Sequence, residues 1–528
     1  MSKKAYIRKE DEKQKAAIAA SELPDFAIHQ VFQLLCPRDV VRASIVSKQW
    51  EREWHSVPVL DLDEEKHVGD YLHSIHHQNF IDYVTWSLKC RLKDKSPLNK
   101  FKLRTIRHVD YRLVDGWLSL ALERNLKELY ISTCKYSNCY GLSAPDNGNY
   151  CLSHKVLDAK FLTVLDLQFV RIDSHDSIRL PSLKSLSLKE CYLRYFHLLS
   201  GCPSIEDLSI NSCYGLSDVK VSSSTLKSLE IIMCFAMYDV KVEAMNLESF
   251  RLGGNQYNYR LRCNMVDFSS CGALRNLDII FAELEEQWFE DFDSRYPAVE
   301  RLILLKCRVL GHINLRSQHL RRFVFENQGY DSILRGRIDT PNLNYLGFWG
   351  SVTWPNTEVH IKAPNLSEAT IVLNDTCTTP MFPFQKSCCI RNFLANFDNC
   401  GTLLTLCACD TKALIFPENM RRECSPPLTS LKHLKVITDI EEVYRYPKTN
   451  TIVKIADLMD SLRWMAPSLE FLSTKTKTSD GIFYEIRRAV DEVMPLSGYF
   501  VSKLLNLPSY YAASLILVAA LVEQQVTL

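Results

Sequence analysis

Residues 203–213 read PSIEDLSINSC, and the apolar residues in this stretch have an unusual spacing. Ile205, Leu208 and Ile210 are followed by Cys213, at steps of three, two and three residues. An amphipathic helix repeats its apolar residues every three or four positions, and a half-buried strand repeats them every second position. The spacing therefore indicates a short strand at Leu208 and Ile210 between two turns, with Ile205 and Cys213 also facing inward.

The same pattern returns along most of the 528-residue chain. From Leu162 to Leu366 successive copies start 21 to 27 residues apart, in the form LxxLxLxx(C/N). This period and form resemble the leucine-rich repeat, in which coils stack because none can bury its apolar side chains alone. Copies start at Leu126, Leu162, Leu183, Ile205, Leu226, Leu247, Leu274, Val299, Leu320, Leu343 and Leu366, and weaker ones at Leu403, Leu431 and Leu469.

The resemblance implies an α/β fold, a curved solenoid whose strands form a parallel sheet on its concave face. The last position of each repeat leaves the strand and turns inward, where a small polar side chain can bond unpaired backbone groups. We expect this structural role for Cys134, Cys191, Cys213, Cys234, Cys307, Asn255 and Asn374. Prolines just before the strands, as in the PNL triplets at 341 and 364, fix the turn that enters each strand.

A different pattern occupies residues 21–54, which read SELPDFAIHQVFQLLCPRDVVRASIVSKQWEREW. Apolar residues fall at helical spacing, Pro24 suits a first helical turn, and Pro37 restarts a second helix. About 35 residues are too few for a full core, so we expect the segment to complete its core on another surface. That surface is either a partner protein or, alternatively, the end of the solenoid, which the segment would then cap.

The stretch resembles an F-box in its Leu23-Pro24-Asp25 start, its PRDVV centre (37–41) and its VSKQW end (46–50). Phe26, Ala27 and His29 depart from the acidic and aliphatic residues usual in the first helix. The resemblance implies a three-helix F-box that docks on a Skp-type adaptor and through it on a cullin. The adaptor contacts that it implies are Leu23, Pro24, Ile28, Val31, Pro37, Val40, Val41, Val46 and Trp50.

An F-box followed by cysteine-bearing repeats is similar to the plant F-box/leucine-rich-repeat family. Between the two, residues 114–124 form an amphipathic pattern with Trp117, Leu118 and Leu122 on its apolar face, which we expect to cap the first coil. The sequence predicts a disordered tail at 1–19, the F-box at 20–60, a helical linker and cap at 61–125, repeats at 126–375, irregular C-terminal repeats at 376–475 and a helical tail at 476–528.

The residues between the strand leucines point away from the core and change character along the array. They are polar in the early repeats and become apolar or aromatic around residues 301–349. Exposed apolar patches mark binding sites, and Trp, Tyr and Arg dominate binding hot spots. We therefore predict that a protein substrate docks on Arg301, Ile303, Leu305, Arg322, Val324, Tyr345 and Trp349. The alternative is that the last 120 residues fold back over this patch.

The amino-acid composition and net charge of the chain limit the kinds of function that it can have. With 46% hydrophobic and 24% charged residues the chain is globular, and its net charge of +1 gives no general attraction to nucleic acid or anionic membranes. The charged start MSKKAYIRKEDEKQK is not a signal peptide, so the 19 cysteines are expected to be reduced, in the cytoplasm or nucleus. The apolar stretch at 510–522 is too short to span a bilayer and is expected to be a terminal helix; a membrane anchor is the alternative.

No catalytic residues, metal site or cofactor are predicted. The sequence contains no paired CxxC motifs and no glycine-rich phosphate loop, HExxH or GxSxG motif. The resemblance thus implies a non-catalytic substrate receptor of a Skp–cullin–F-box ubiquitin ligase. Two alternatives stay open: an interaction scaffold whose partner is not degraded, and a small-molecule co-receptor, although Glu230, Asp278 and Glu326 interrupt the arginines that would line a basic floor.

Overall fold

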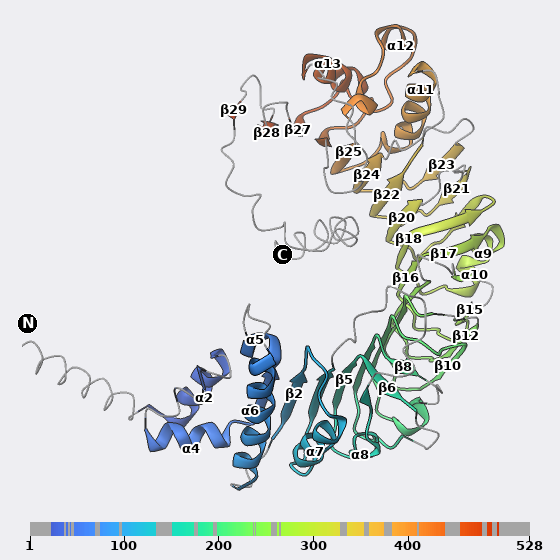
Figure 1. The fold of residues 1–528 in the computed structure, drawn as a ribbon. Helices are drawn as coiled ribbons and strands as arrows, with labels where there is room; N and C mark the ends of the chain where they lie inside the picture. The colour runs from blue at the N-terminus through green and yellow to red at the C-terminus, as the bar shows by residue number, and fades with distance from the viewer. Residues whose placement is uncertain are drawn as a thin grey trace, which may run out of the picture. The chain divides into compact units, whose positions relative to one another are not determined.

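The computed structural model divides into two compact units, Met1–Leu247 and Glu248–Leu528, and each is described by itself. Figure 1 shows the order of their helices and strands. The described residues are 23–35, 39–40, 43, 47–68, 74–93, 98–133, 150–173, 178–193, 198–235, 237, 239–254, 261–262, 266–327, 335–352, 358–373, 383–408, 411–438, 455–477, 483–487 and 494–495.

The first unit begins with helices. Helix α2 (Asp25–Leu34) starts directly after Pro24, whose carbonyl accepts from the amides of Ala27 and Ile28 at 2.9 and 3.2 Å. Residues 39, 40 and 43 are also helical, and α4 (Lys48–Ser56) follows. Helices α5 (Glu64–Val68), α6 (Ser74–Lys93) and α7 (Tyr111–Leu122) come next in the chain.

Helix α7 confirms the predicted amphipathic segment, with one correction. Asp110 caps its start by accepting from the amide of Arg112 at 2.9 Å. Val114, Trp117, Leu118 and Ala121 are buried, whereas Leu122 is only half buried. The buried stripe follows the 3.6-residue period, which places position 121 rather than 122 on the same face as 114, 117 and 118.

Parallel strands follow one another through the first unit. They pair in the order β1 (Val59–Asp63), β2 (Lys100–Arg104), β3 (Glu128–Ser132), β5 (Val164–Gln168), β7 (Ser185–Lys189), β9 (Asp207–Asn211) and β11 (Ser228–Ile232). The linking segments carry short parallel strands of their own, β4 (Tyr150–Cys151), β6 (Val170–Ile172) and β8 (Tyr192–Leu193), then β10 (Asp218–Ser222) and β12 (Asp239–Glu243). Short helices α8 (His154–Leu157) and η1 (Leu198–Gly201) complete this unit.

The second unit repeats this plan. Its main sheet runs through β13 (Ser249–Gly253), β16 (Asn276–Ile280), β18 (Arg301–Leu310), β20 (Arg322–Asn327), β22 (Tyr345–Gly350), β24 (Glu368–Leu373), β25 (Leu403–Ala408), β26 (His433–Thr438) and β27 (Phe471–Lys477), all parallel. It ends with antiparallel β28 (Phe483–Arg487) and β29 (Met494–Pro495).

In the second unit, the segments that link successive strands of the main sheet change from strands to helices along the chain. Early ones carry β14 (Leu261–Arg262), β15 (Val266–Asp267), β17 (Ala282–Glu285), β19 (Ile313–Arg316), β21 (Arg335–Asp339) and β23 (Glu358–Lys362), with α9 (Glu286–Glu290) and α10 (Phe292–Arg295). Later ones carry α11 (Pro383–Leu394), η3 (Ala395–Phe397), η4 (Thr411–Leu414), α12 (Glu418–Glu423) and α13 (Ile455–Met465). The fold class is therefore confirmed: a mixed α/β chain with an N-terminal helical module and a parallel-strand solenoid.

The opening stretch shows how each coil is built. Leu208 and Ile210 lie on the core side of β9, and Ile205 and Cys213 are buried before and after it. Each buried Leu or Ile stabilises the coil by roughly 1.5–3 kcal/mol. The strand pairs in register with β7 and β11, so Leu208 lies between Leu186 and Leu229. The three-two-three spacing is thus the spacing of one coil's inward side chains.

Asparagine side chains tie neighbouring coils together just before the strands. The Nδ2 atom of Asn342 donates to the carbonyl of Gln318 at 2.7 Å, and that of Asn365 donates to the carbonyl of Pro341 at 2.9 Å. Asn246 makes the same bond to Ser224 at 2.7 Å. The PNL triplets therefore do more than fix a turn, because their asparagine also satisfies a carbonyl one coil earlier.

The cysteines after the strands have the expected structural role. The thiols of Cys191, Cys213 and Cys307 donate to backbone carbonyls of the preceding coil at 3.3–3.4 Å. The residue before each cysteine has a left-handed backbone, for example φ 55° at Ser212, and this conformation turns the chain inward. Cys134, Asn255 and Asn374 lie outside the described residues.

The buried thiols of Cys202 and Cys234 should resist alkylation in the folded protein. Burial raises the pKa of Cys202 to about 11 and that of Cys234 to about 12, whereas Cys151 is exposed. Because the thiolate is the nucleophile, iodoacetamide at pH 8 should label Cys151 and spare Cys202 and Cys234 until denaturant is added. Peptide mass spectrometry measures the labelling rates, and equal rates at the three sites would contradict the assignment.

No helix in the described part of the chain is long and apolar enough to cross a membrane. The apolar stretch at 510–522, the tail at 1–19 and the segment 496–528 lie outside the described residues. The domain boundaries given above stay predictions.

Candidate functional site

The N-terminal module has a small core of its own. Ile28, Phe32, Val40, Trp50, Trp54 and Val57 are buried together, with Val31 half buried against them. Phe32 and Trp50 meet edge to face with ring centroids 5.3 Å apart. Ile28, Val31, Val40 and Trp50, which the resemblance gives as adaptor contacts, therefore pack against one another, and their contact with an adaptor stays a prediction. Pro37, Val41 and Val46 lie outside the described residues.

The start of α2 presents the exposed apolar residues of the module. Leu23 is 36% exposed and Phe26 is 67% exposed, and Pro24 between them is also exposed. Large apolar side chains are normally buried, so exposed neighbours at one helix end mark an interaction surface. We call Leu23, Pro24 and Phe26 the α2 edge. The sequence indicated Leu23 and Pro24, but Phe26 stood out only as a departure from the F-box pattern.

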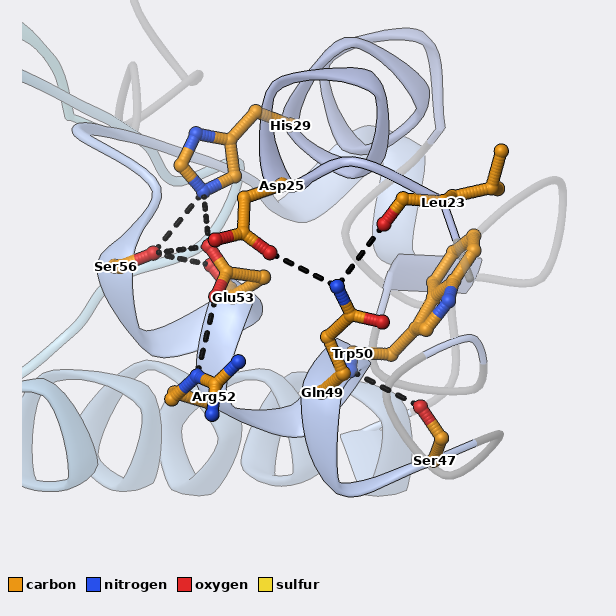
Figure 2. Close-up of polar contacts among 9 residues, drawn as sticks. All are labelled: Leu23, Asp25, His29, Ser47, Gln49, Trp50, Arg52, Glu53 and Ser56. Atoms are coloured by element: carbon orange, nitrogen blue, oxygen red, sulfur yellow. Dashed lines mark hydrogen bonds and ion pairs between the residues drawn. The ribbon is translucent and has the colours of Figure 1, made fainter. Parts of the chain in front are cut away.

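Gln49 holds the α2 edge against α4. Its Nε2 atom donates to the carbonyl of Leu23 at 3.0 Å and to Oδ1 of Asp25 at 2.9 Å (Figure 2). The hydroxyl of Ser47 caps α4 by accepting from the amide of Trp50 at 3.3 Å. One side chain therefore fixes the backbone at the start of α2 relative to the helix that carries Trp50.

A second polar contact joins the middle of α2 to the last turn of α4. Nε2 of His29 lies 3.0 Å from Oε2 of Glu53 and 3.0 Å from the hydroxyl of Ser56 (Figure 2). Glu53 is buried, and its other oxygen accepts from Nε of Arg52 at 3.3 Å. Because a buried carboxylate is costly without partners, these contacts are part of what keeps the two helices in place.

Helix α6 supports the module from the side of the repeats. Trp54 stacks on Trp86 with ring centroids 5.0 Å apart. At the other end of this support, the buried Glu64 accepts from the amide of Ile106 at 2.7 Å, and its second oxygen lies 2.6 Å from Nδ1 of His77. The helix that holds the α2 edge is thus itself packed on α6.

The second candidate site is the predicted substrate patch of the second unit. Ile303, Leu305, Val324, Tyr345 and Trp349 do lie on the face of the main sheet that points away from the core, as predicted. Their exposure was predicted wrongly, because each is less than 10% exposed and they pack together with Val372 and Cys407. An open apolar face is therefore absent among these described residues, and their mutual contacts are the physical reason.

The two arginines of the patch differ in their partners. Arg301 forms an ion pair with Asp278, with its Nη1 atom 2.9 Å from Oδ1. The guanidinium of Arg322 lies 4.1 Å above the ring of Tyr345, while its Nε and Nη2 atoms have no hydrogen-bond partner. Burial, together with the nearby charge of Arg301, lowers the pKa of Arg322 below its usual value. Of the two arginines, Arg322 is therefore the one with N–H donors that make no hydrogen bond.

Two more buried groups in the patch lack partners. The Oε2 atom of Glu326 and the Nε1 atom of Trp349 are both buried without a hydrogen bond. Burial raises the pKa of Glu326 to about 7, against a smaller opposing effect of Lys306. The sequence does not indicate this site, because Glu326 stands out there only as an interruption of a basic floor.

No group of three or more His, Cys, Asp or Glu side chains placed to hold a metal ion occurs among the described residues. What the two sites can do chemically is bind: the α2 edge offers apolar surface, and the patch offers unpaired donors and an acceptor.

Comparison with known proteins finds a match both for the N-terminal module and for part of the repeats. The F-box domain profile matches residues 20–62, and the profile described as "FBD-associated F-box protein At5g56370, LRR repeats" matches residues 114–268. The chain is 30% identical over 202 residues to F-box/FBD/LRR-repeat protein At4g26340 of Arabidopsis thaliana, covering 36% of this chain and 43% of that protein.

Other relatives from the same plant give similar figures. FBD-associated F-box protein At5g56380 is 29% identical over 203 residues, covering 37% of this chain and 43% of its own length. F-box/LRR-repeat protein At4g14096 is 26% identical over 196 residues, covering 36% and 39%. The chain thus spans about two fifths of the length of these relatives.

Proposed function

We propose that this chain, which has the F-box and the leucine-rich repeats of the plant F-box/LRR-repeat proteins, is the substrate-recognition subunit of a Skp–cullin–F-box ubiquitin ligase. The observation that carries the proposal is the α2 edge, an exposed apolar surface at the start of the F-box that Gln49 and α6 hold in a fixed place. Leu23, Pro24 and Phe26 are its adaptor contacts, and Ile28, Val40 and Trp50 support them from below.

The proposed subunit does no chemistry itself. It brings a bound substrate close to the conjugating enzyme of the ligase, which raises the effective concentration of the substrate there. The repeats supply the substrate-binding face, and β18, β20 and β22 of the second unit carry the residues proposed to contact the substrate.

Phe26→Asp should abolish adaptor binding without unfolding the F-box. The side chain is largely exposed, so its replacement leaves the core intact and puts a charge where an apolar contact forms. We expect the affinity for a purified Skp-type adaptor to fall at least tenfold in isothermal titration calorimetry. Phe161→Asp is the matched control, because Phe161 is 57% exposed in the first unit but lies outside the F-box.

Equal adaptor affinity in the Phe26→Asp and wild-type proteins would rule out the α2 edge as the contact.

Leu23→Ala combined with Pro24→Ala distinguishes a ligase subunit from an interaction scaffold whose partner is not degraded. In the ligase, this double substitution removes cullin from the purified complex and raises the cellular level of the bound partner. A partner whose level ignores the substitution would instead support the scaffold.

A further inference from the structure

The described cysteines of the chain differ in how far their thiols are exposed. Eight of the twelve are buried, and Cys151 is exposed in the first unit. The other three, Cys388, Cys389 and Cys424, are half buried, and all lie on α11 or directly after α12. Buried thiols such as that of Cys307 donate to backbone carbonyls inside the coils. The half-buried thiols therefore form a separate cluster that the repeat pattern does not explain.

Arg391 joins the two elements that carry this cluster. Its Nε atom donates to the carbonyl of Ser425 at 2.8 Å, and its Nη2 atom donates to Oγ of Ser425 at 2.7 Å. Cys388 lies three residues before Arg391 on α11 and so on the same helix face. Cys424 is the residue directly before Ser425. The guanidinium of Arg391 thus holds the face of α11 that carries Cys388 against the chain at Cys424.

The electrostatics of the cluster agree with this placement. Burial raises the pKa of Cys388, the nearby Cys424 raises it further, and the charge of Arg391 opposes both effects. One thiol disfavours the charge of another only when the two are close, so Cys388 and Cys424 are neighbours in space. Burial also raises the pKa of Cys389, and there the second contribution comes from Cys388. Cys388 and Cys424 are therefore the pair that meets across the two elements.

The backbone at these positions favours this pair over the adjacent one. Successive residues of an α-helix point about 100° apart, so Cys388 and Cys389 do not face each other. A disulfide needs Cα atoms about 4.4–6.8 Å apart and Cβ atoms that point together. Cys424 can adjust to this requirement because its backbone has left the helix and is extended, with φ −109° and ψ 147°. A shift of the chain at Cys424 would then close the bond without moving α11.

We propose that Cys388 and Cys424 form a reversible disulfide that links α11 to the end of α12 under oxidising conditions. The oxidant is a low-molecular-weight disulfide such as oxidised glutathione. One cysteine thiolate attacks a sulfur of the oxidant, forms a mixed disulfide and releases one glutathione thiol. The second thiolate attacks the sulfur of the first cysteine and releases the other glutathione. The chain thereby gives up two protons and two electrons, and one oxidised glutathione becomes two reduced ones.

The disulfide would act as a redox-dependent lock on the last coils of the second unit. It closes a loop from 388 to 424 that contains β25 and α12. A cross-link of this kind stabilises the folded chain because it limits the freedom of the unfolded one. Since glutathione keeps cytosolic thiols reduced, the lock closes only when the share of oxidised glutathione rises. This inference does not depend on the proposed function, because it concerns the stability of the repeats alone.

The test incubates the purified full chain at pH 8 with reduced glutathione alone or with a mixture of reduced and oxidised glutathione. Iodoacetamide then blocks the remaining thiols, and peptide mass spectrometry without reductant identifies the linked cysteines. We expect Cys388 joined to Cys424 in most of the oxidised sample and in none of the reduced one. The calorimetric melting temperature should rise on oxidation by about 5–10 °C.

Single substitutions assign the disulfide to this pair. Cys388→Ser should abolish both the linked peptide and the rise in melting temperature, whereas the matched control Cys389→Ser should retain both. Arg391→Lys keeps the charge but loses the two-pronged bond to Ser425, so it should form the disulfide at least threefold more slowly. A wild-type chain without the linked peptide, a bond from either thiol to another cysteine, or a disulfide that leaves the melting temperature unchanged would overturn the proposal.

Discussion

Glu326→Gln should stabilise the second unit at pH 8 by roughly 3 kcal/mol and remove a pH dependence that the wild-type protein shows. The carboxyl group is buried beside Trp349 without a partner for Oε2, and burial raises its pKa from the ordinary 4.5 to about 7. Each unit of pKa difference between the folded and unfolded chain corresponds to about 1.4 kcal/mol.

The direction follows from proton binding. Between pH 4.5 and 7 the folded chain holds a proton on Glu326 that the unfolded chain has released. Stability from this group is therefore fully present below pH 4.5, falls as the pH rises to about 7, and is flat above that. Glutamine has the shape of the protonated acid and does not titrate, so the variant should lack this decline.

Calorimetric melting temperatures of the full chain from pH 5 to 8 measure the effect. Glu358→Gln is the control, since Glu358 is 74% exposed beside His360 and should change the pH profile little. If the wild-type and Glu326→Gln proteins lose stability in parallel over this range, Glu326 does not carry a buried charge at neutral pH.

The sequence predicts the coils well because their signal is local. Leu208 and Ile210, or Leu229 and Ile231, face the core at a period of two within five-residue strands, and each coil repeats this requirement. The cysteine at the end of the coil is equally local, because it bonds carbonyls only a strand away. Such features depend on neighbours that the spacing itself brings together.

The substrate patch is harder to predict because its burial depends on several coils at once. Period two correctly places Tyr345 and Trp349 on the face away from the core. Whether that face is open depends on how far Tyr345 extends over Gly347 and on the stacking of Arg322 on its ring. These contacts join strands 20 or more residues apart, and no repeat pattern records them.

The F-box illustrates the same limit. Helical spacing marks Ile28 and Trp50 as inward-facing, but it does not say whether a partner or the module's own helices cover them. The structure shows Phe32, Trp54 and Val57 around them, so the exposed Phe26 becomes the residue of interest instead. Helical spacing thus predicts a buried side chain more readily than it identifies the surface that binds.

Trp50→Ala should unfold the F-box and abolish adaptor binding as a consequence. Trp50 fills a core of only a few large side chains, against the edge of Phe32, and truncating a buried tryptophan costs about 3–5 kcal/mol. A core this small cannot spread the resulting cavity over many neighbours, so α2 and α4 should lose their packing together. Hydrogen exchange of their amides should rise from protected to nearly unprotected, while β7, β9 and β11 of the repeats stay protected.

Trp86→Ala is the matched control for the size of the side chain removed. Trp86 is 46% exposed on α6 and covers Trp54 from outside the F-box core, so its loss should cost far less and leave α2 and α4 protected. Compared with Phe26→Asp, the two tryptophan variants distinguish a residue that contacts the adaptor from a residue that stabilises the F-box core. Phe26→Asp should lose the adaptor with the helices intact, whereas Trp50→Ala should lose both. Retained amide protection in Trp50→Ala, combined with lost adaptor binding, would instead make Trp50 a direct contact and reverse its assignment to the core.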